Sequence, residues 1–293
     1  MTSIYYHYCS IDAFMKIVIQ KKIRLCNVMK LNDEEECIDI DRIIDEVVNE
    51  NNDWNNDKNV LELIKDYKKH KVVTHKAYIA CFSKDKDRLS QWRSYANDGK
   101  GVAIGFDFNK LTSRTNDEIR TLSNCSPEIV TMINTSLGHY KVIYSEEDKK
   151  QLINSILSSY VSEVNMKEYK DLDSIINKFS RVLLKCTTIF KNQCFNEEEE
   201  KRIVYLPYLD ENNNIEGKKV VNTINNIINM NKGYYCKEDI IIGYYEYDFN
   251  KDSISEIVLG PKCNMSEEDI DLKSFLDAHI VGYSITKSKA TYR

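Results

Sequence analysis

The chain has 293 residues and a formal net charge of −5 at pH 7, and 42% of its residues are hydrophobic and 10% aromatic. That length allows one large domain or two small ones, with a sizeable core either way. The acidic balance argues against a generally basic coat for nucleic acid, although basic residues cluster locally at 16–30 and 65–76.

Targeting and metal signals are also missing from the sequence. The first eight residues have neither a basic segment nor an apolar core, so no signal peptide is expected. No run of about 18 apolar residues occurs, which predicts that no segment crosses a membrane. The nine cysteines are scattered without a Cys-x-x-Cys pair, and the five histidines do not combine with them at zinc-site spacing. We therefore expect a cytoplasmic protein with reduced thiols and no structural metal.

The first predicted elements are a strand, a helix and a second strand. Ile4–Tyr8 is short and aromatic, and Ser10 is a plausible N-cap for a helix whose apolar face recurs at positions 11, 14, 15, 18 and 19. The alternation over 23–27 predicts the second strand. His7 and Arg24 are polar residues inside these apolar strands. His7 is either a site residue or a satisfied core histidine, and Arg24 is either an anion binder or an edge-strand charge.

The remaining predicted elements alternate between helices and strands. Apolar residues recur at helical spacing over 38–48, 60–67, 152–164 and 175–188, and a last helix at 266–276 is predicted to be capped by Ser266. Strands are predicted at 77–83, 102–108, 141–144, 240–249, 254–259 and 279–286, while 218–230 fits either type and 32–37 is turn-like. The pattern predicts a single α+β domain over 1–293, with small mixed or antiparallel sheets and helical insertions at about 36–76 and 111–190.

A second organised region lies around residues 77–108. A strand is followed by Trp92 and Tyr95, then by the turn residues Asn97–Gly101, and then by another strand. Trp92 and Tyr95 are either core aromatics or a platform for a cofactor ring. No Gly-x-Gly-x-x-Gly, Walker or Gly-x-Ser-x-Gly motif is present, so the sequence gives no support to a Rossmann, P-loop or serine-hydrolase interpretation.

The most strongly patterned stretch is Phe195–Tyr205, in which four glutamates precede Lys201, Arg202 and an apolar run. In a strand, Glu198, Glu200 and Arg202 would share one face, and the guanidinium would relieve the repulsion between the carboxylates. Such a face suits a ligand rich in hydroxyl groups. In a helix, the same glutamates would form i,i+4 pairs with Lys201 and Arg202 on a solvated surface.

Several separated pieces of the chain, taken in order, carry a family resemblance. They are Tyr6-His7-Tyr8-Cys9-Ser10-Ile11-Asp12, Ile23-Arg24-Leu25-Cys26-Asn27, Leu31-Asn32-Asp33 with the glutamates after it, Cys81-Phe82-Ser83, Trp92 with Tyr95, Gly101–Asp107, Phe195 with Glu198, Glu200 and Arg202, Ile254–Gly260 and Ser288–Arg293. This ordered set resembles the widespread bacterial domain-of-unknown-function family 2971.

That family looks similar in architecture to the ADP-ribosyltransferase superfamily, especially its toxin-like members. Those enzymes bind NAD in a cleft between two small sheets, with a His on the first strand, an aromatic residue in the middle and a catalytic Glu on a late strand. The resemblance implies that His7 holds a ribose hydroxyl, that Tyr8 or Tyr95 stacks on nicotinamide, and that Glu198 or Glu200 stabilises an oxocarbenium-like state.

The resemblance thus implies a set of site residues and three classes of function. The catalytic candidates are His7, Glu198 and Glu200, and the NAD-binding candidates are His7, Tyr8, Arg24, Trp92, Tyr95 and Arg202. The first function is ADP-ribosylation of a protein or nucleic-acid acceptor, as a toxin or antiphage effector with an antitoxin or other defence partner. The second is an NAD glycohydrolase that uses water as the acceptor. The third is a non-catalytic module that senses a nucleotide or binds a partner protein.

Overall fold

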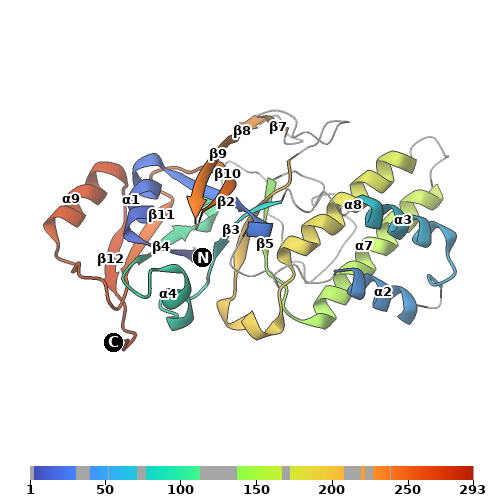
Figure 1. The fold of residues 1–293 in the computed structure, drawn as a ribbon, viewed down its shortest axis with the longest axis horizontal. Helices are drawn as coiled ribbons and strands as arrows, with labels where there is room; N and C mark the ends of the chain where they lie inside the picture. Colours follow the sequence, from blue (N-terminus) through green and yellow to red (C-terminus); the bar gives the residue numbers. More distant parts are fainter. Residues whose placement is uncertain are drawn as a thin grey trace.

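The protein combines two open β-sheets with helices, and a computed structural model describes residues 3–30, 40–51, 53–70, 77–112, 137–166, 172–207, 219–221, 227–237 and 239–292 (Figure 1). The first sheet has four strands in the order β1-β4-β11-β12. Their bounds are Ile4–Cys9, Val102–Asp107, Ile254–Leu259 and Ser284–Lys287. Its pairs are antiparallel except for the parallel pair β11–β12.

The second sheet has six strands in the order β5-β6-β3-β2-β10-β9, all antiparallel. Their bounds are Leu137–Lys141, Lys201–Tyr205, Tyr78–Phe82, Lys22–Asn27, Ile240–Asp248 and Asn231–Lys237. A separate pair joins β7 (Lys219–Val221) to β8 (Ile227–Asn229). The predicted α+β class with small mixed and antiparallel sheets is therefore confirmed.

The two sheets meet at the end of β3, next to β1. β3 pairs with β2 only at Ile79 and Tyr78, whereas it pairs with β6 along its whole length. Just past the end of β3, Ser83 exchanges both backbone hydrogen bonds with Tyr6 of β1, at 2.8 and 2.9 Å. β3 is thus a strand of the six-stranded sheet, and the residue that follows it is hydrogen-bonded to β1 of the four-stranded sheet.

The helices form two groups. Four long helices lie together at one end of the molecule (Figure 1): α2 (Ile40–Glu50), α3 (Lys58–His70), α7 (Glu146–Met166) and α8 (Leu172–Ile189). At the other end, α1 (Ile11–Gln20) contacts α9 (Ile270–His279) beside the four-stranded sheet. The short helices α4 (Leu89–Tyr95) and α5 (Phe108–Leu111) flank β4 in the chain.

Alternating side chains of the six-stranded sheet contribute to two separate cores. On one face, Ile79, Tyr140 and Val204 join the apolar sides of the four long helices. On the other face, Phe82 and Ile203 join α1, α9 and the inner face of the four-stranded sheet. The six-stranded sheet therefore separates a helical half from a sheet-rich half.

Most predicted elements are found, with several shifts. Ser10 caps α1 as expected, because its Oγ accepts a hydrogen bond from the N–H of Ala13 at 3.2 Å. The predicted cap at Ser266 is wrong: α9 begins at Ile270, and Asp269 caps it by accepting from the N–H of Leu272. The predicted turn at Asn97–Gly101 has three successive residues with positive φ, Asn97, Asp98 and Gly99.

Other expectations need correction or fall outside the described residues. The predicted strand at 141–144 is instead β5 at 137–141, and the ambiguous segment 218–230 contains β7 and β8. The turn expected at 32–37 lies outside the described residues. No disulfide joins the seven described cysteines, Cys9, Cys26, Cys81, Cys186, Cys194, Cys236 and Cys263. Among the described helices, none is both long and apolar enough to pass through a membrane.

Candidate functional site

The glutamate-rich stretch changes conformation in its middle. Residues 193–198 form a short 3-10 helix capped by Asn192, whose side chain accepts from the N–H of Cys194. Glu199 then adopts a left-handed conformation with φ of 41°, and β6 starts at Lys201. The expectation that Glu198, Glu200 and Arg202 share a face of one strand is therefore wrong: Glu198 ends the 3-10 helix, Glu200 lies one residue before β6, and only Arg202 is in the strand. The helical alternative is wrong too, because the 3-10 helix ends before Lys201 and Arg202.

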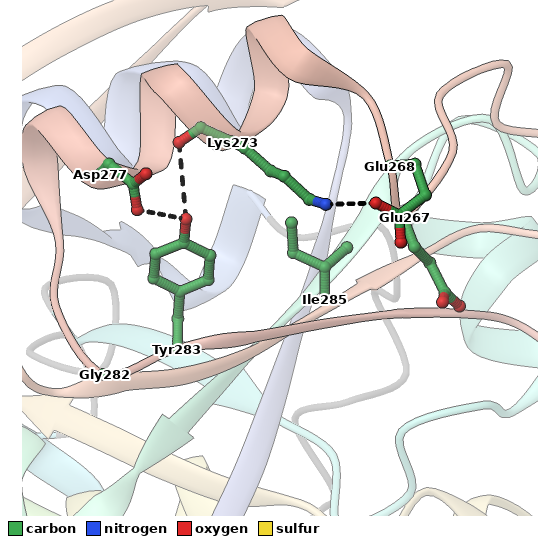
Figure 2. Close-up of a pocket in the computed structure, with 7 residues that line it drawn as sticks. All are labelled: Glu267, Glu268, Lys273, Asp277, Gly282, Tyr283 and Ile285. Atoms are coloured by element: carbon green, nitrogen blue, oxygen red, sulfur yellow. Dashed lines mark hydrogen bonds and ion pairs between the residues drawn. The ribbon is translucent and has the colours of Figure 1, made fainter.

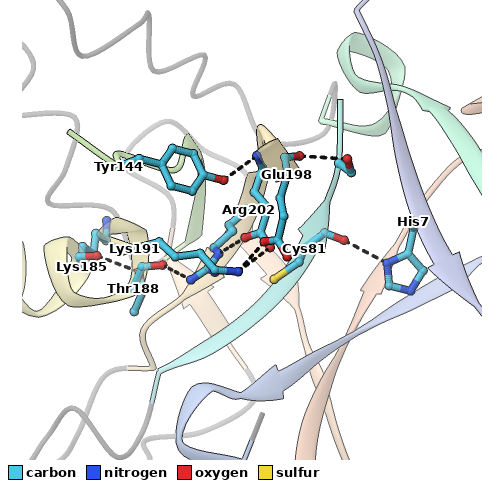
Figure 3. A network of polar contacts seen from close by, with 10 residues as sticks. His7, Cys81, Tyr144, Lys185, Thr188, Lys191, Glu198 and Arg202 are labelled. Carbon is cyan, nitrogen blue, oxygen red and sulfur yellow. Dashed lines mark hydrogen bonds and ion pairs between the residues drawn. The ribbon is translucent and has the colours of Figure 1, made fainter. Parts of the chain in front are cut away.

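The turn nevertheless brings the predicted charges together (Figure 3). Lys191 lies between the two carboxylates, with its Nζ 2.5 Å from Glu198 Oε2 and 3.2 Å from Glu200 Oε1. Arg202 donates from Nε to Glu200 Oε2 at 2.7 Å and from a terminal nitrogen to the carbonyl of Thr188 at 2.8 Å. All four charged residues are buried, and Arg202 and Lys191 are 0% exposed. We call Lys191, Glu198, Glu200 and Arg202 the charged network.

The two carboxyl groups differ in their proton affinity. Burial raises the pKa of Glu198, and the neighbouring charge of Glu200 raises it further, against the opposing effect of Lys191. Burial alone would also raise the pKa of Glu200, but Arg202 and Lys191 lower it below its usual value. The two carboxyl groups therefore favour one protonation state, in which Glu200 is ionised and Glu198 is able to carry a proton near neutrality.

Tyr95 borders the charged network from the end of α4. Its side chain is 37% exposed, yet burial is the main cause that raises the pKa of its hydroxyl, and Glu198 is the next. Part of the side chain faces solvent, and the hydroxyl lies close enough to Glu198 for that carboxyl group to affect its pKa. α4 is also joined to the 3-10 helix, because the Ser90 hydroxyl donates to Glu197 at 2.8 Å.

His7 lies on the other side of β3 from the charged network. Its Nδ1 is 3.0 Å from the carbonyl oxygen of Cys81, the residue that pairs with Arg202 in the sheet (Figure 3). A carbonyl only accepts, so Nδ1 carries the proton. Burial lowers the pKa of His7, which keeps the ring neutral and leaves Nε2 as an acceptor. Nε2 has no hydrogen-bond partner among the described residues. The strand that carries His7 and the strand that carries Arg202 are close in space, since only β3 separates β1 from β6.

Two of the predicted binding aromatics are instead part of the fold. Trp92 is 0% exposed and donates from Nε1 to Asp87 at 2.7 Å. Tyr8 packs edge-on against Trp92 with 4.7 Å between ring centroids, and its hydroxyl donates to the carbonyl of Asp85. Both side chains are closed off in a small core next to α4. Neither is available to stack on a ligand ring.

The two predicted arginines also have different surroundings. Arg24 is exposed on β2, with its guanidinium 4.3 Å from the ring centroid of Tyr244 on β10. β3 lies between β2 and β6, so Arg24 extends away from the charged network. Arg202 does belong to the network, but as a fully buried residue it holds Glu200 in place and is itself out of reach of a ligand.

Sequence reasoning missed Lys191, Cys81 and Tyr144. Tyr144 accepts from the N–H of Glu200 at 3.0 Å and so fixes the start of β6. Lys191 follows the apolar run at the end of α8, and a lysine directly after such a run, nine residues before Glu200, was a signal that could have been used. Cys81 gave no such signal, because a cysteine is ordinary in an apolar strand.

A pocket lies apart from these residues, between α9 and β12 (Figure 2). Its volume is about 530 Å³, and Glu267, Lys273, Asp277 and Tyr283 are among its lining residues. Lys273 pairs with Glu268, and the Tyr283 hydroxyl donates to Asp277. None of the predicted site residues lines this pocket.

The chemistry available at the charged network is that of two carboxyl groups with separated pKa values. One can exchange a proton near neutrality while the other keeps a negative charge, which suits acid–base catalysis and stabilisation of a developing positive charge. Within the described part of the chain, no three His, Cys, Asp or Glu side chains are grouped so as to hold a metal ion.

Comparison with known proteins gives one match. The family model described as a protein of unknown function (DUF2971) matches residues 91–203, a range that contains Tyr95 and all four members of the charged network. No curated protein and no solved structure matches the chain. The match supports the resemblance to this family and assigns no activity.

Proposed function

We propose that the protein is an NAD-dependent ADP-ribosyltransferase. In the reaction, the bond between ribose C1′ and the pyridinium nitrogen of NAD breaks, and its electron pair leaves with neutral nicotinamide. A nucleophilic atom of a protein or nucleic-acid acceptor then bonds to C1′, and the proton that this atom loses passes to a carboxylate or to water. Water in place of the macromolecule makes the same site an NAD glycohydrolase.

The observation that carries the proposal is the unequal pair Glu198 and Glu200. Glu200 pairs with both Arg202 and Lys191, whereas Glu198 pairs with Lys191 alone. Glu198 is therefore the carboxyl group better suited to contact a ribose and to accept the proton of the acceptor. Negative charge held in a partly dry site stabilises a positively charged sugar more strongly than it would in water.

Two neighbouring groups support the same substrate. The free acceptor atom of His7, Nε2, suits a ribose hydroxyl, which can donate a hydrogen bond to it. The partly exposed ring of Tyr95, beside Glu198, suits a planar ring that leaves from the ribose. A role as a toxin or antiphage effector follows only from the resemblance and is part of the proposal.

A second candidate is a non-catalytic module that senses a nucleotide or binds a partner. One observation favours it: the side chains of Glu198 and Glu200 are only 8% and 4% exposed, and Lys191 and Arg202 already neutralise them. Buried ion networks of this kind also occur for purely structural reasons. The two candidates differ in one measurable property, the release of nicotinamide.

The experiment compares nicotinamide release by the wild type, Glu198→Gln and Glu200→Gln at equal protein concentration. Gln keeps the shape but can neither carry a negative charge nor exchange a proton, so loss of the ribose-contacting group should lower the rate roughly a hundredfold. We expect the larger loss for Glu198→Gln. Glu199→Gln, an exposed neighbour, is the matched control, and melting temperatures show that each variant folds.

The outcome decides between the candidates. A wild type that releases no nicotinamide with protein, nucleic acid or water as acceptor would remove the enzyme proposal and leave the binding module. The same conclusion would follow if both Gln variants kept the wild-type rate.

A further inference from the structure

Three buried tyrosines meet on one face of the six-stranded sheet. Tyr205 on β6, Tyr78 on β3 and Tyr245 on β10 are 3%, 4% and 4% exposed. The ring of Tyr245 lies 4.8 Å, centroid to centroid, from the rings of both Tyr78 and Tyr205, and it meets each of them edge-on. Because β3 and β2 lie between β6 and β10, the side chains of Tyr205 and Tyr245 lean toward each other over the sheet. We call these three residues the tyrosine cluster.

The hydroxyl groups of the tyrosine cluster have no hydrogen-bond partner among the described residues. Buried polar groups usually do have one, as the hydroxyls of Tyr6 and Tyr247 show by donating at 2.7 and 2.9 Å. None of the three oxygens in the cluster is fully enclosed. On the same face of the sheet, Lys232 lies directly opposite Tyr245 in the β9–β10 pair, and Lys232 and Tyr234 are exposed, Tyr234 to 62%. A small ligand that approaches over β9 therefore meets three unused hydroxyl groups.

Two cations border the tyrosine cluster. Lys232 is one, since its charge opposes the effect of burial on the pKa of Tyr78. Arg181 is the other, because it donates at 3.0 Å to the carbonyl of Leu206, the residue that follows Tyr205. Burial raises the pKa of Tyr205 to about 12, so its hydroxyl keeps the proton near neutral pH and is able to donate it in a hydrogen bond. No carboxylate of the described residues shifts the pKa of any of the three tyrosines.

We propose that the tyrosine cluster, with Lys232 and Arg181, binds a phosphate group. The oxygens of phosphate accept hydrogen bonds and carry negative charge, which matches three hydroxyl donors beside two cations. The ligand enters over β9, where Lys232 is exposed. Tyr205 belongs to the core shared with the four-stranded sheet, whereas its neighbour Val204 belongs to the helical core on the side of Arg202. The site is therefore across the sheet from the charged network, and the inference does not rest on the proposed function.

The test is calorimetric titration of the full chain with inorganic phosphate, AMP and adenosine, near neutral pH and at low salt. We expect saturable binding of phosphate and of AMP, and no binding of adenosine, because the nucleoside lacks the anion. Affinity for phosphate should fall as salt is added, since the two cations contribute to it. AMP that binds more tightly than phosphate would identify the ligand as a nucleotide phosphate, and equal affinities would identify it as the free anion; both results support the site.

Phenylalanine variants remove the hydroxyl groups and keep the rings. Tyr205→Phe and Tyr245→Phe should each weaken phosphate binding roughly tenfold to a hundredfold, the usual effect of one lost hydrogen bond to a charged group, and replacing all three tyrosines should abolish it. The lost hydroxyls have no partner in the fold, so the melting temperature should stay the same or rise. Lys232→Gln should also weaken binding. Tyr235→Phe, on the opposite face of β9, is the matched control and should bind phosphate like the wild type.

Three results would overturn the inference: a wild type that binds neither phosphate nor AMP, adenosine that binds as tightly as AMP, or phenylalanine variants that bind phosphate like the wild type. If the triple variant does not fold, the single variants decide the matter by the same comparison. Weakened binding at an unchanged melting temperature would establish the site. Glu198→Gln should bind phosphate like the wild type, whether or not the protein releases nicotinamide, because the sheet separates the two places.

Discussion

Glu198 and Glu200 should give the stability of the protein opposite dependences on pH. The folded-state pKa of Glu198 is raised, so its contribution is fully present below the ordinary glutamate pKa and is lost as pH rises through the raised value. The folded-state pKa of Glu200 is lowered, so its contribution is present above the ordinary value and is lost as pH falls through the lowered one. Stability from the pair is thus greatest in mildly acidic solution.

Melting curves of the wild type and Glu198→Gln over about pH 5 to 8 test this assignment. Gln does not titrate, so the melting temperature of the wild type should fall relative to that of Glu198→Gln as pH rises. Glu199→Gln supplies the control, since its difference from the wild type should not show this fall. A wild-type advantage that stays constant or grows with pH would contradict the raised pKa of Glu198.

Individual residues differ in how far the sequence reveals them. Glu198, Glu200 and Arg202 could be found because a dense run of charge beside an apolar strand is uncommon, and the structure brings them together. Lys191 was missed although the lysine after an apolar run was a usable signal, and its two partners depend on how α8 ends against β6. Arg24 and Trp92 were predicted as binding residues but have structural contacts instead. The sequence could not exclude this, because a polar residue in a strand and an aromatic residue in a helix also have structural uses.

The helix α4, which carries Trp92 and Tyr95, is held in place mainly from outside its own seven residues. Asp87, just before α4, accepts from Trp92 Nε1 at 2.7 Å, from the Ser288 hydroxyl at 2.5 Å and from the N–H of Lys289 at 2.7 Å. A helix this short has little stability of its own. The carboxylate of Asp87 therefore connects α4 to Ser288 and Lys289, which lie 201 and 202 residues further along the chain.

Replacing Asp87 should loosen α4 as an element. Asp87→Ala removes three hydrogen bonds to a charged group and leaves the indole N–H of Trp92 without its acceptor, so we expect the free energy of unfolding to fall by about 2–4 kcal/mol. Chemical denaturation measures the loss, and amide exchange should accelerate over 89–95. Asp45→Ala, which removes a surface ion pair with Lys68, should cost less than about 1 kcal/mol. Equal losses for the two variants would show that Asp87 does not anchor α4.

The type of an element was easier to predict than its limits or its partners. Strong periodicity identified α1, α8 and β11 because their apolar residues must repeat to face a core. β9 was missed, since Asn231–Lys237 mixes glycine, tyrosine and lysine on an edge strand with little burial. The 3-10 turn before β6 was also missed, because the left-handed residue that ends it is a glutamate and not the glycine that usually marks such a position.

The arrangement of the whole molecule places the charged network at the join of its two halves. Arg202 on β6 reaches the carbonyl of Thr188 on α8, and Lys191 lies two residues after the end of α8. The helical core lies on this side of the six-stranded sheet, and the core shared with the four-stranded sheet lies on the other. Sequence periodicity predicted the elements of both halves, but it contains no information on strand order, which brings β1 and β6 to either side of β3.

Arg202→Met should therefore weaken the contact between α8 and β6 more than it weakens the strand pairing within the two sheets. The change leaves Glu200 buried without its guanidinium, so the free energy of unfolding should fall by about 3–5 kcal/mol. Hydrogen exchange should then lose most protection in α8, at 172–189, while β4 and β11 keep theirs. Arg42→Met, which removes surface ion pairs with Glu46 and Glu146, is the matched control and should cost less than about 1 kcal/mol. A uniform loss of protection through both halves would mean that Arg202 stabilises the molecule as one unit, and a loss as small as the control would mean that the network does not hold α8 to β6.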